Sequence, residues 1–145
     1  MRSLRHVFLV LALAALAPEH AQTAAASAAQ WGILGTWALQ CDKPVSRANA
    51  YLIYRAEGDR VVHDRDFGDT RDSFPVESVT ILSDGTVKLR VNFTSFNQVR
   101  EWAMLRAPDG RIRVVWNQAV GGDFSVKDSR NTKSGNEMPW QTRCK

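Results

Sequence analysis

The sequence predicts an all-β fold, an antiparallel meander of about eight strands. Turn signals recur roughly every ten residues, the segment 87–93 alternates strictly between apolar and polar residues, and no helical apolar period follows the N-terminal apolar run. The 145 residues, 44% of them hydrophobic, suffice for one domain with a sizeable core. We expect the meander to close into a small barrel, which removes exposed strand edges; a β-sandwich is the alternative.

The N-terminus has the pattern of a secretory signal peptide. Arg2 and Arg5 precede an apolar run at 7–16, and small residues follow. As a helix this run spans about 15 Å, roughly half of a membrane's hydrocarbon core, which disfavours an anchor. We expect a signal peptide at 1–26, with cleavage between Ala17 and Ala29; the small residues before Ala17 and before Ala26 both fit a cleavage site. The expected mature protein is periplasmic or secreted, with no membrane span. A flexible segment at 27–33 and a single β domain at 34–145 complete the predicted organisation.

The two cysteines, Cys41 and Cys144, lie near the two ends of the predicted domain. In an oxidising compartment, the simplest arrangement of two such thiols is one disulfide. Neither belongs to a Cys-x-x-Cys pair, so a redox-active or zinc site is not indicated. A bond between the first strand and the end of the chain also favours closure of the sheet.

Turns rich in glycine and proline separate the predicted strands. We place the strands at 34–41, 51–55, 60–66, 79–82, 86–93, 98–106, 111–117 and 124–127. In 86–93 the apolar residues Val87, Leu89, Val91 and Phe93 share one face. In 111–117, Ile112, Val114 and Trp116 are expected on one face, although Val115 interrupts the alternation. The segments 67–75 and 128–139 are expected to be polar loops.

Gly35-Thr36-Trp37 on the first predicted strand resembles the Gly-x-Trp motif of the lipocalins and the wider calycin group. The resemblance implies a lipocalin-like barrel in which Trp37 packs across the closed end. It also implies a basic side chain over that tryptophan, with Arg143, or less readily Arg113, in this role. The expected domain is shorter than a lipocalin and has no predicted outer helix. A small secreted bacterial barrel, similar to periplasmic protease inhibitors, fits equally well.

Aromatic residues are the main candidates for ligand binding, because tryptophan and tyrosine combine a large apolar surface with one polar group. We expect Trp37, Tyr51, Phe93, Trp102 and Trp116 to line a cavity, with core packing as the alternative. Glu101 is a further candidate. Either Glu101 faces the interior, or its neighbours Trp102 and Met104 do, with arginines at the two ends of the strand.

The search for catalytic residues finds little. His63 is the one histidine after the leader, and Asp64 and Asp66 beside it are interpreted as solvated and locally paired. One histidine does not make a usual zinc site, and the phosphate-loop, EF-hand and serine-elbow motifs are absent from the sequence. No catalytic residue, metal or cofactor is therefore predicted. Without Arg2, Arg5 and Glu19, 17 basic and 14 acidic residues remain, interleaved along the chain, so nucleic-acid binding is not predicted.

The sequence thus predicts an exported β-barrel that binds a small apolar or amphipathic ligand. The alternative is a protein-binding envelope module, an inhibitor or accessory factor with a filled barrel, that uses the segments 67–75 and 128–139. An enzyme is the least favoured class, because no acid, base and nucleophile converge in the sequence. The volume of the interior distinguishes the first two hypotheses, because a roomy barrel favours a ligand and a filled barrel favours protein binding.

Overall fold

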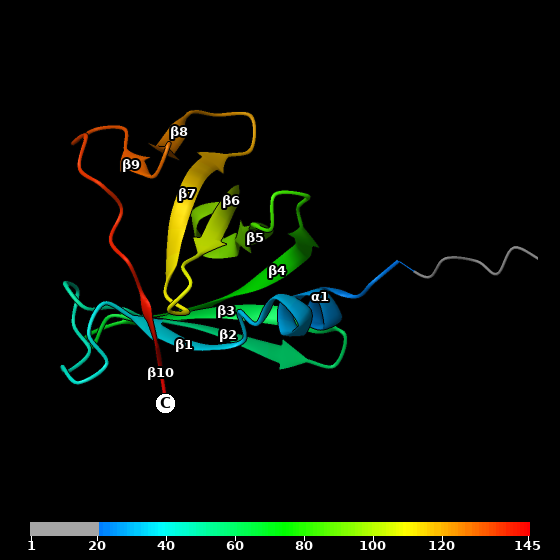
Figure 1. Ribbon diagram of the computed structural model, residues 1–145, viewed down its shortest axis with the longest axis horizontal. Helices are drawn as coiled ribbons and strands as arrows, with labels where there is room; N and C mark the ends of the chain where they lie inside the picture. The colour runs from blue at the N-terminus through cyan, green and yellow to red at the C-terminus, as the bar shows by residue number, and fades with distance from the viewer. Residues whose placement is uncertain (1–20) are drawn as a thin grey trace, which may run out of the picture.

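The computed structural model describes residues 21–145 and consists of one curved antiparallel sheet with a short helix against it (Figure 1). Most of the predicted signal peptide, residues 1–20, lies outside the described residues. The sheet has ten strands in the order β10-β1-β2-β3-β4-β5-β6-β7-β8-β9, so the predicted antiparallel meander is confirmed, with two strands more than expected. The elements are α1 (Ala24–Trp31), β1 (Gly35–Ala38), β2 (Tyr51–Glu57), β3 (Arg60–Asp66), β4 (Arg71–Ile81), β5 (Val87–Phe93), η1 (Thr94–Phe96), β6 (Gln98–Arg106), β7 (Ile112–Ala119), β8 (Phe124–Lys127), β9 (Arg130–Asn131) and β10 (Thr142–Cys144).

The strand β4 is much longer than the predicted strand at 79–82. It includes residues 71–75, which were expected in a polar loop, so that prediction is wrong. Its outward residues are polar and it contains Pro75, so this part of the sequence has the composition of a loop. Its inward residues Phe74, Val76 and Val79 are buried, and a register shift between Val76 and Ser78 keeps them on one face.

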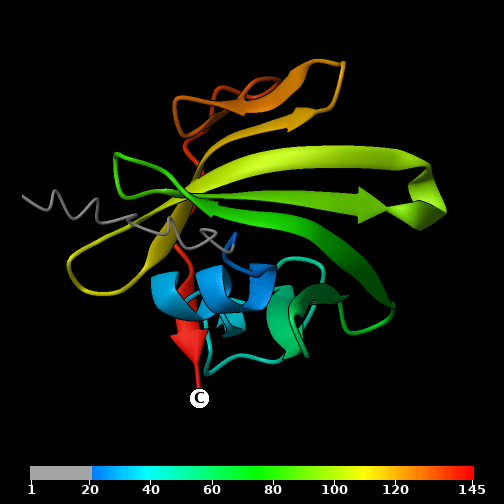
Figure 2. The same cartoon turned by 90° about the vertical axis from the view of Figure 1, so that its right-hand side faces the viewer.

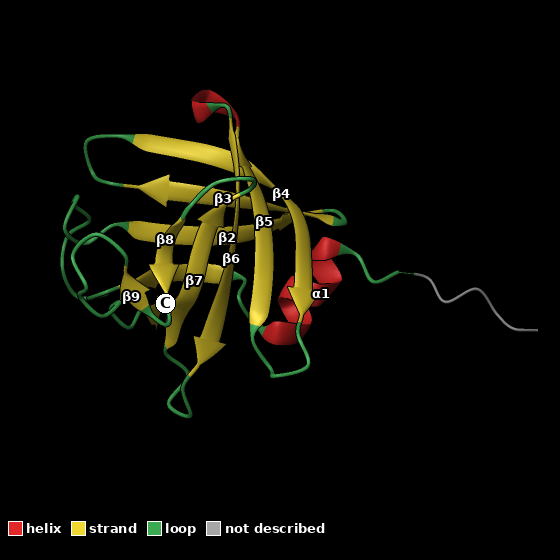
Figure 3. Ribbon diagram, turned by 90° about the horizontal axis from the view of Figure 1, so that it is seen from above, coloured by secondary structure: helices red, strands yellow, loops and turns green. Residues whose placement is uncertain are grey.

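The predicted closure into a barrel is not confirmed, because the sheet described by residues 21–145 does not close. The edge strands β9 and β10 have two and three residues and are not paired with each other. One isolated bridge connects the first residue of β7 to the residue before β10. The Ile112 N–H donates to the Gln141 carbonyl at 3.0 Å, and the Gln141 N–H donates back at 2.8 Å. From above, the sheet is strongly curled (Figure 3).

The prediction that no helix follows the leader is wrong. The helix α1 begins after Thr23, whose Oγ1 accepts from the Ala26 N–H at 3.1 Å, and ends at Trp31, with Gly32 as its C-cap. Alanine favours the helical backbone, but a run of alanines shows no apolar period from which a helix is predicted. Fully buried Ala28 and Ile33 anchor α1 and the residues after it, where a flexible segment was expected. Within residues 21–145, no helix has the length and apolar character needed to cross a membrane.

The helix α1 covers one end of the curved sheet (Figure 2). It packs against β3 and β4, and its Ala25 N–H donates to the Asp59 carbonyl in the β2–β3 turn. The Trp31 Nε1–H donates to the Gly85 carbonyl in the β4–β5 turn at 2.8 Å. The apolar face predicted for 86–93 lies in the core: Val87, Leu89 and Val91 are 0% exposed. The core therefore occupies the concave side of the sheet.

The Gly-x-Trp motif lies on β1 beside the last strand. Trp37 is 1% exposed, and its Nε1–H donates to the Ile33 carbonyl at 2.7 Å. Arg143 is its cross-strand partner on β10 and donates from Nη2 to the Leu34 carbonyl at 2.8 Å. A Cβ on Gly35, whose φ is 130°, would lie 2.9 Å from Arg143 Nε, so this position requires glycine. Arg113 instead lies over Trp140, 4.5 Å from its ring centroid.

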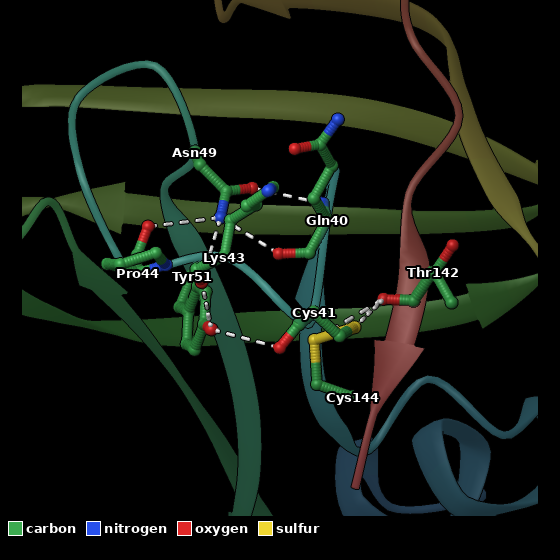
Figure 4. The surroundings of a disulfide bond; sticks show 8 residues. All are labelled: Gln40, Cys41, Lys43, Pro44, Asn49, Tyr51, Thr142 and Cys144. Carbon is green, nitrogen blue, oxygen red and sulfur yellow. Dashed lines mark hydrogen bonds between the residues drawn. A yellow bond between two sulfur atoms is a disulfide. The ribbon is translucent and has the colours of Figure 1, made fainter.

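The predicted disulfide between Cys41 and Cys144 is present, with the two Cα atoms 5.3 Å apart (Figure 4). It joins the residues after β1 to β10, across 103 positions of sequence. The adjacent loop is held by Asn49, whose amide exchanges hydrogen bonds with the Gln40 backbone at 2.9 and 3.0 Å. Tyr51 donates its hydroxyl to the Lys43 carbonyl at 2.9 Å in the same loop.

Candidate ligand-binding cavity

A cavity of about 230 Å³ lies on the concave side of the sheet. Five strands, β2, β3, β5, β6 and β7, contribute to its wall. On β2, β3 and β6 the lining residues are two apart, because such residues point to the same side of a strand. On β7, Val114 and Asn117 are three apart because of a register shift between them. The lining residues are Leu52, Tyr54, His63, Arg65, Phe67, Phe93, Trp102, Met104, Val114, Asn117 and Gln141. Most are aromatic or aliphatic, and a few polar groups lie among them.

Three neighbouring rings form much of the cavity wall. Tyr54 and His63, opposite each other on β2 and β3, stack with centroids 4.5 Å apart. Trp102 meets His63 in an edge-on arrangement, with centroids 5.7 Å apart. Burial strongly raises the pKa of Tyr54, so its hydroxyl stays protonated at neutral pH. All three side chains are buried, with at most 5% of their surface exposed.

His63 is the least satisfied polar group of this wall. Its Nδ1 is buried and has no hydrogen-bond partner among residues 21–145. Burial lowers the pKa of His63 to about 4, with the nearby Arg65 charge as a second cause. The imidazole is therefore neutral at pH 7. A buried polar atom without a partner is costly, so a ligand that supplies one gains binding energy.

Arg65 lines the cavity near the end of β3 that is remote from the β2–β3 turn. It binds Asp72 through two hydrogen bonds, from Nε at 2.7 Å and from Nη2 at 2.5 Å. Its guanidinium carbon is 5.1 to 5.8 Å from the centroids of four rings, those of Phe67, Phe74, Phe93 and Phe96. Cation–π contacts with phenylalanine hold the charge among apolar groups. Phe96 is 61% exposed, so aromatic surface continues outward from the cavity.

The strand β6 shows which face of 98–106 points inward. Trp102 and Met104 are buried on the concave side, and Arg100 and Arg106 lie toward the two ends of the strand. Glu101 lies on the convex side, where it accepts from Arg90 Nη1 at 3.2 Å. Of the two alternatives for this strand, the one with an inward glutamate is wrong.

Arg100 lies beside the cavity and is half-buried. It donates from Nε to Asn117 Oδ1 at 2.8 Å, from Nη1 to Gln98 Oε1 at 3.1 Å and from Nη2 to Ser125 Oγ at 2.7 Å. Asn117 also lines the cavity, so this network connects Arg100 to the interior. Burial lowers the pKa of Arg100 below its usual value.

The structure brings together only part of the predicted ligand-binding set. Phe93 and Trp102 line the cavity, whereas Trp37 and Tyr51 pack elsewhere, under β10 and beside the disulfide loop. Trp116 lies on the opposite face, edge-on to Phe124 at 6.4 Å. A register shift at Val115 pairs Val114 with Met104 but Trp116 with Ala103, so the expectation that Val114 and Trp116 share a face is wrong.

The polar residues of the cavity were missed by the sequence analysis. Strand alternation places His63 and Arg65 on one face, and the apolar Val61 on the same face gives a signal that this face is buried. Asp64 and Asp66 are locally paired as interpreted, since Asp64 accepts from Arg55 Nε at 2.6 Å and Asp66 lies 2.7 Å from Arg71 Nη2. Asp66 is buried, however, so its interpretation as solvated is wrong. Among the described residues, no group of three or more histidine, cysteine or acidic side chains is arranged to hold a metal ion.

Comparisons of the chain with protein-family models, curated proteins and solved structures find no match. The site must therefore be interpreted from its own geometry. It is a small, mostly apolar cavity with one unpartnered imidazole nitrogen, one arginine in its lining and a second arginine beside it.

Proposed function

We propose that this protein binds a small amphipathic molecule in the concave cavity. The observation that carries the proposal is the buried His63 Nδ1, which lacks a hydrogen-bond partner within residues 21–145 and lies on the wall of an aromatic cavity. Ligand pockets typically combine an apolar lining with a few polar groups that fix orientation. Tyr54, Trp102 and Phe93 supply the apolar contacts, and His63 supplies the polar one.

The volume of the cavity limits the size of the ligand. An engineered apolar cavity of about 150 Å³ accommodates benzene, and pockets for drug-sized ligands have about 300 to 1,000 Å³. The cavity of about 230 Å³ lies between these values. A single aromatic ring with one or two substituents fits this space.

We also infer a barrel-like site in an exported protein. The Ile112–Gln141 bridge and the Cys41–Cys144 disulfide support a barrel, because they hold β10 between β1 and the beginning of β7. The disulfide and the leader pattern support export, because structural disulfides persist in oxidising compartments. The lipocalin-like identity of this barrel rests on the Gly-x-Trp resemblance.

An NMR titration with phenol tests the proposal, because five tryptophan indole N–H signals report on different regions. We expect the Trp102 signal to shift saturably and the Trp116 signal, from the opposite face, to stay constant. His63→Phe keeps a flat ring but removes the polar nitrogen, and should weaken phenol binding. A Trp102 signal that does not respond to phenol or to other single-ring probes would contradict a ligand site here.

The alternative is a protein-binding module, and one surface feature favours it. Phe124 and Val120 are 39% and 49% exposed, and Phe124 with Trp116 lines a hollow of about 300 Å³. The predicted binding segment 67–75 contributes less than expected, because residues 71–75 belong to β4. Loss of a protein interaction in Phe124→Ser, with single-ring binding unchanged, would favour this function.

A further inference from the structure

Arg100 carries a positive charge that no acidic group balances. Its three hydrogen-bond partners, Asn117, Gln98 and Ser125, are all neutral. Among residues 21–145 no carboxylate oxygen lies within 4.0 Å of it. Arg65, the other arginine near the cavity, is bound by Asp72 through two of its nitrogens. Within the described part of the chain, Arg100 is therefore an unpaired cation beside the cavity.

The guanidinium of Arg100 is held in place and still has donors to offer. Guanidinium groups have five N–H donors, and Arg100 uses three in the contacts above. Two N–H groups remain, one on each terminal nitrogen. The neutral partners fix the orientation of the group before any ligand arrives, which lowers the entropy cost of binding. Such fixed donors suit a carboxylate, which pairs with arginine in a planar geometry.

Arg100 lies on the same face of β6 as Trp102, which is part of the cavity wall. It lies two residues before Trp102, and its cross-strand partner on β5 is the buried Val91. Asn117 joins Arg100 to the cavity lining, since it accepts from Arg100 Nε and lines the cavity itself. Because Arg100 is half-buried, an anion here is less screened by water than on an open surface.

We propose that the ligand is a single-ring aryl carboxylate, whose ring lies against Trp102 and whose carboxylate pairs with Arg100. This inference rests on the proposed function and specifies the class of ligand. Ring contacts with Tyr54 and Trp102 supply apolar burial, and the anion neutralises a charge that the fold leaves unpaired. Charge-assisted hydrogen bonds are roughly twice as strong as neutral ones, so the anion contributes to both affinity and selectivity.

Benzoate and benzamide test this inference, because they have nearly the same shape and differ in charge. By calorimetry and by the Trp102 indole signal, wild-type protein should bind benzoate about tenfold more tightly than benzamide at pH 7. Arg100→Gln should abolish this preference, and Arg100→Lys should retain part of it. The control Arg90→Gln removes a convex-side arginine that is paired with Glu77 and Glu101, and should leave the preference unchanged.

The possible outcomes separate the two proposals. Equal binding of benzoate and benzamide to the wild type would overturn the aryl carboxylate class and leave a cavity ligand standing. Binding of neither probe, with an unchanged Trp102 signal, would overturn both. A benzoate preference that persists in Arg100→Gln would show that another group recognises the anion, and would overturn the role of Arg100. If Arg100→Gln does not fold, the benzoate and benzamide affinities of the wild type and of Arg100→Lys test the role of Arg100 instead.

Discussion

Tyr54 and His63 stack on the concave face of the sheet, with ring centroids 4.5 Å apart and planes inclined by 14°. The imidazole is almost completely buried, and its Nδ1 has no partner among the described residues. A histidine in this setting favours its neutral form, because a buried charge without a counter-ion is costly. Its protonation is therefore coupled to the stability of the fold.

The first prediction is a loss of stability as the pH falls from about 6.5 to about 4. The pKa of His63 is about 4 in the folded protein, whereas the ordinary value for a solvated histidine, which applies to the unfolded chain, is 6.5. Well above pH 6.5 the residue is neutral in both states. Between the two values the unfolded chain binds a proton that the folded chain does not, so the free energy of unfolding decreases. At about 1.4 kcal/mol per pKa unit, the loss is roughly 3 kcal/mol.

The control for this prediction is His63→Phe, which keeps an aromatic ring but cannot titrate. Urea denaturation at pH 7 and pH 4.5 should show a smaller loss for this variant than for the wild type. The nearby charges of Arg65, Asp72 and Asp64 act on His63 in both directions and remain in the variant. Identical pH dependence in the two proteins would contradict a neutral, buried His63.

The second prediction concerns Trp37. Replacing a buried tryptophan by alanine removes its packing and leaves a cavity, at a typical cost of about 3 to 5 kcal/mol. Since Trp37 is 1% exposed, Trp37→Ala should lower the denaturant midpoint sharply. Trp31→Ala, at a half-buried ring held by one indole hydrogen bond and by Arg106, should cost less. Equal losses in the two variants would contradict a central packing role for Trp37.

The third prediction concerns the Cys41–Cys144 disulfide. Thiol labelling of the unfolded, unreduced protein should find no free cysteine. A closed loop of this length stabilises by up to about 4 to 5 kcal/mol in the chain-entropy model, so reduction should lower the denaturant midpoint. A double variant, Cys41→Ser with Cys144→Ser, should have a midpoint that does not depend on reductant. Two reactive thiols in the untreated protein would contradict the bond.

The fourth prediction is export with cleavage before Thr23. This residue caps α1, and the helix contributes the buried Ala28, so cleavage after Ala26 would remove part of a packed element. Mass spectrometry of protein from the cell envelope should find the first residue between positions 18 and 23. An N-terminus at Ser27 would show that α1 is not retained. An intact Met1 in cytoplasmic protein would contradict export.

The fold was predictable where side-chain alternation and turn chemistry agree. The segment 87–93 alternates without exception, and it forms a strand whose apolar face is buried. The strand β4 was only partly found, because Pro75 and a register shift disturb its pattern. The helix α1 was missed, because alanines reveal no preferred face. Its position depends on Gly85 and Asp59, far along the chain.

The candidate site was less predictable than the fold. Trp102 and Phe93 were found as large aromatic residues on strands, which is a property of each residue alone. Arg100 was missed, because its lack of an acidic partner depends on which side chains the sheet places around it. Trp116 was assigned to the wrong face, since the face depends on how Val115 pairs with β6. The environment of Arg100 and the face of Trp116 thus both depend on contacts between strands, which the sequence alone does not reveal.

The pairing of β1 with both β2 and β10 has a kinetic consequence. β2 is the next strand in the sequence, whereas β10, whose Cys144 pairs with Thr36, follows all the other strands of the sheet and is synthesised after them. Contacts between such distant segments carry a large loop-closure entropy and slow the folding of β-rich chains. Trp37 therefore acquires its final neighbour in a late step. Until then β1 offers an unpaired edge, and a chaperone that shields this edge would raise the yield of native protein.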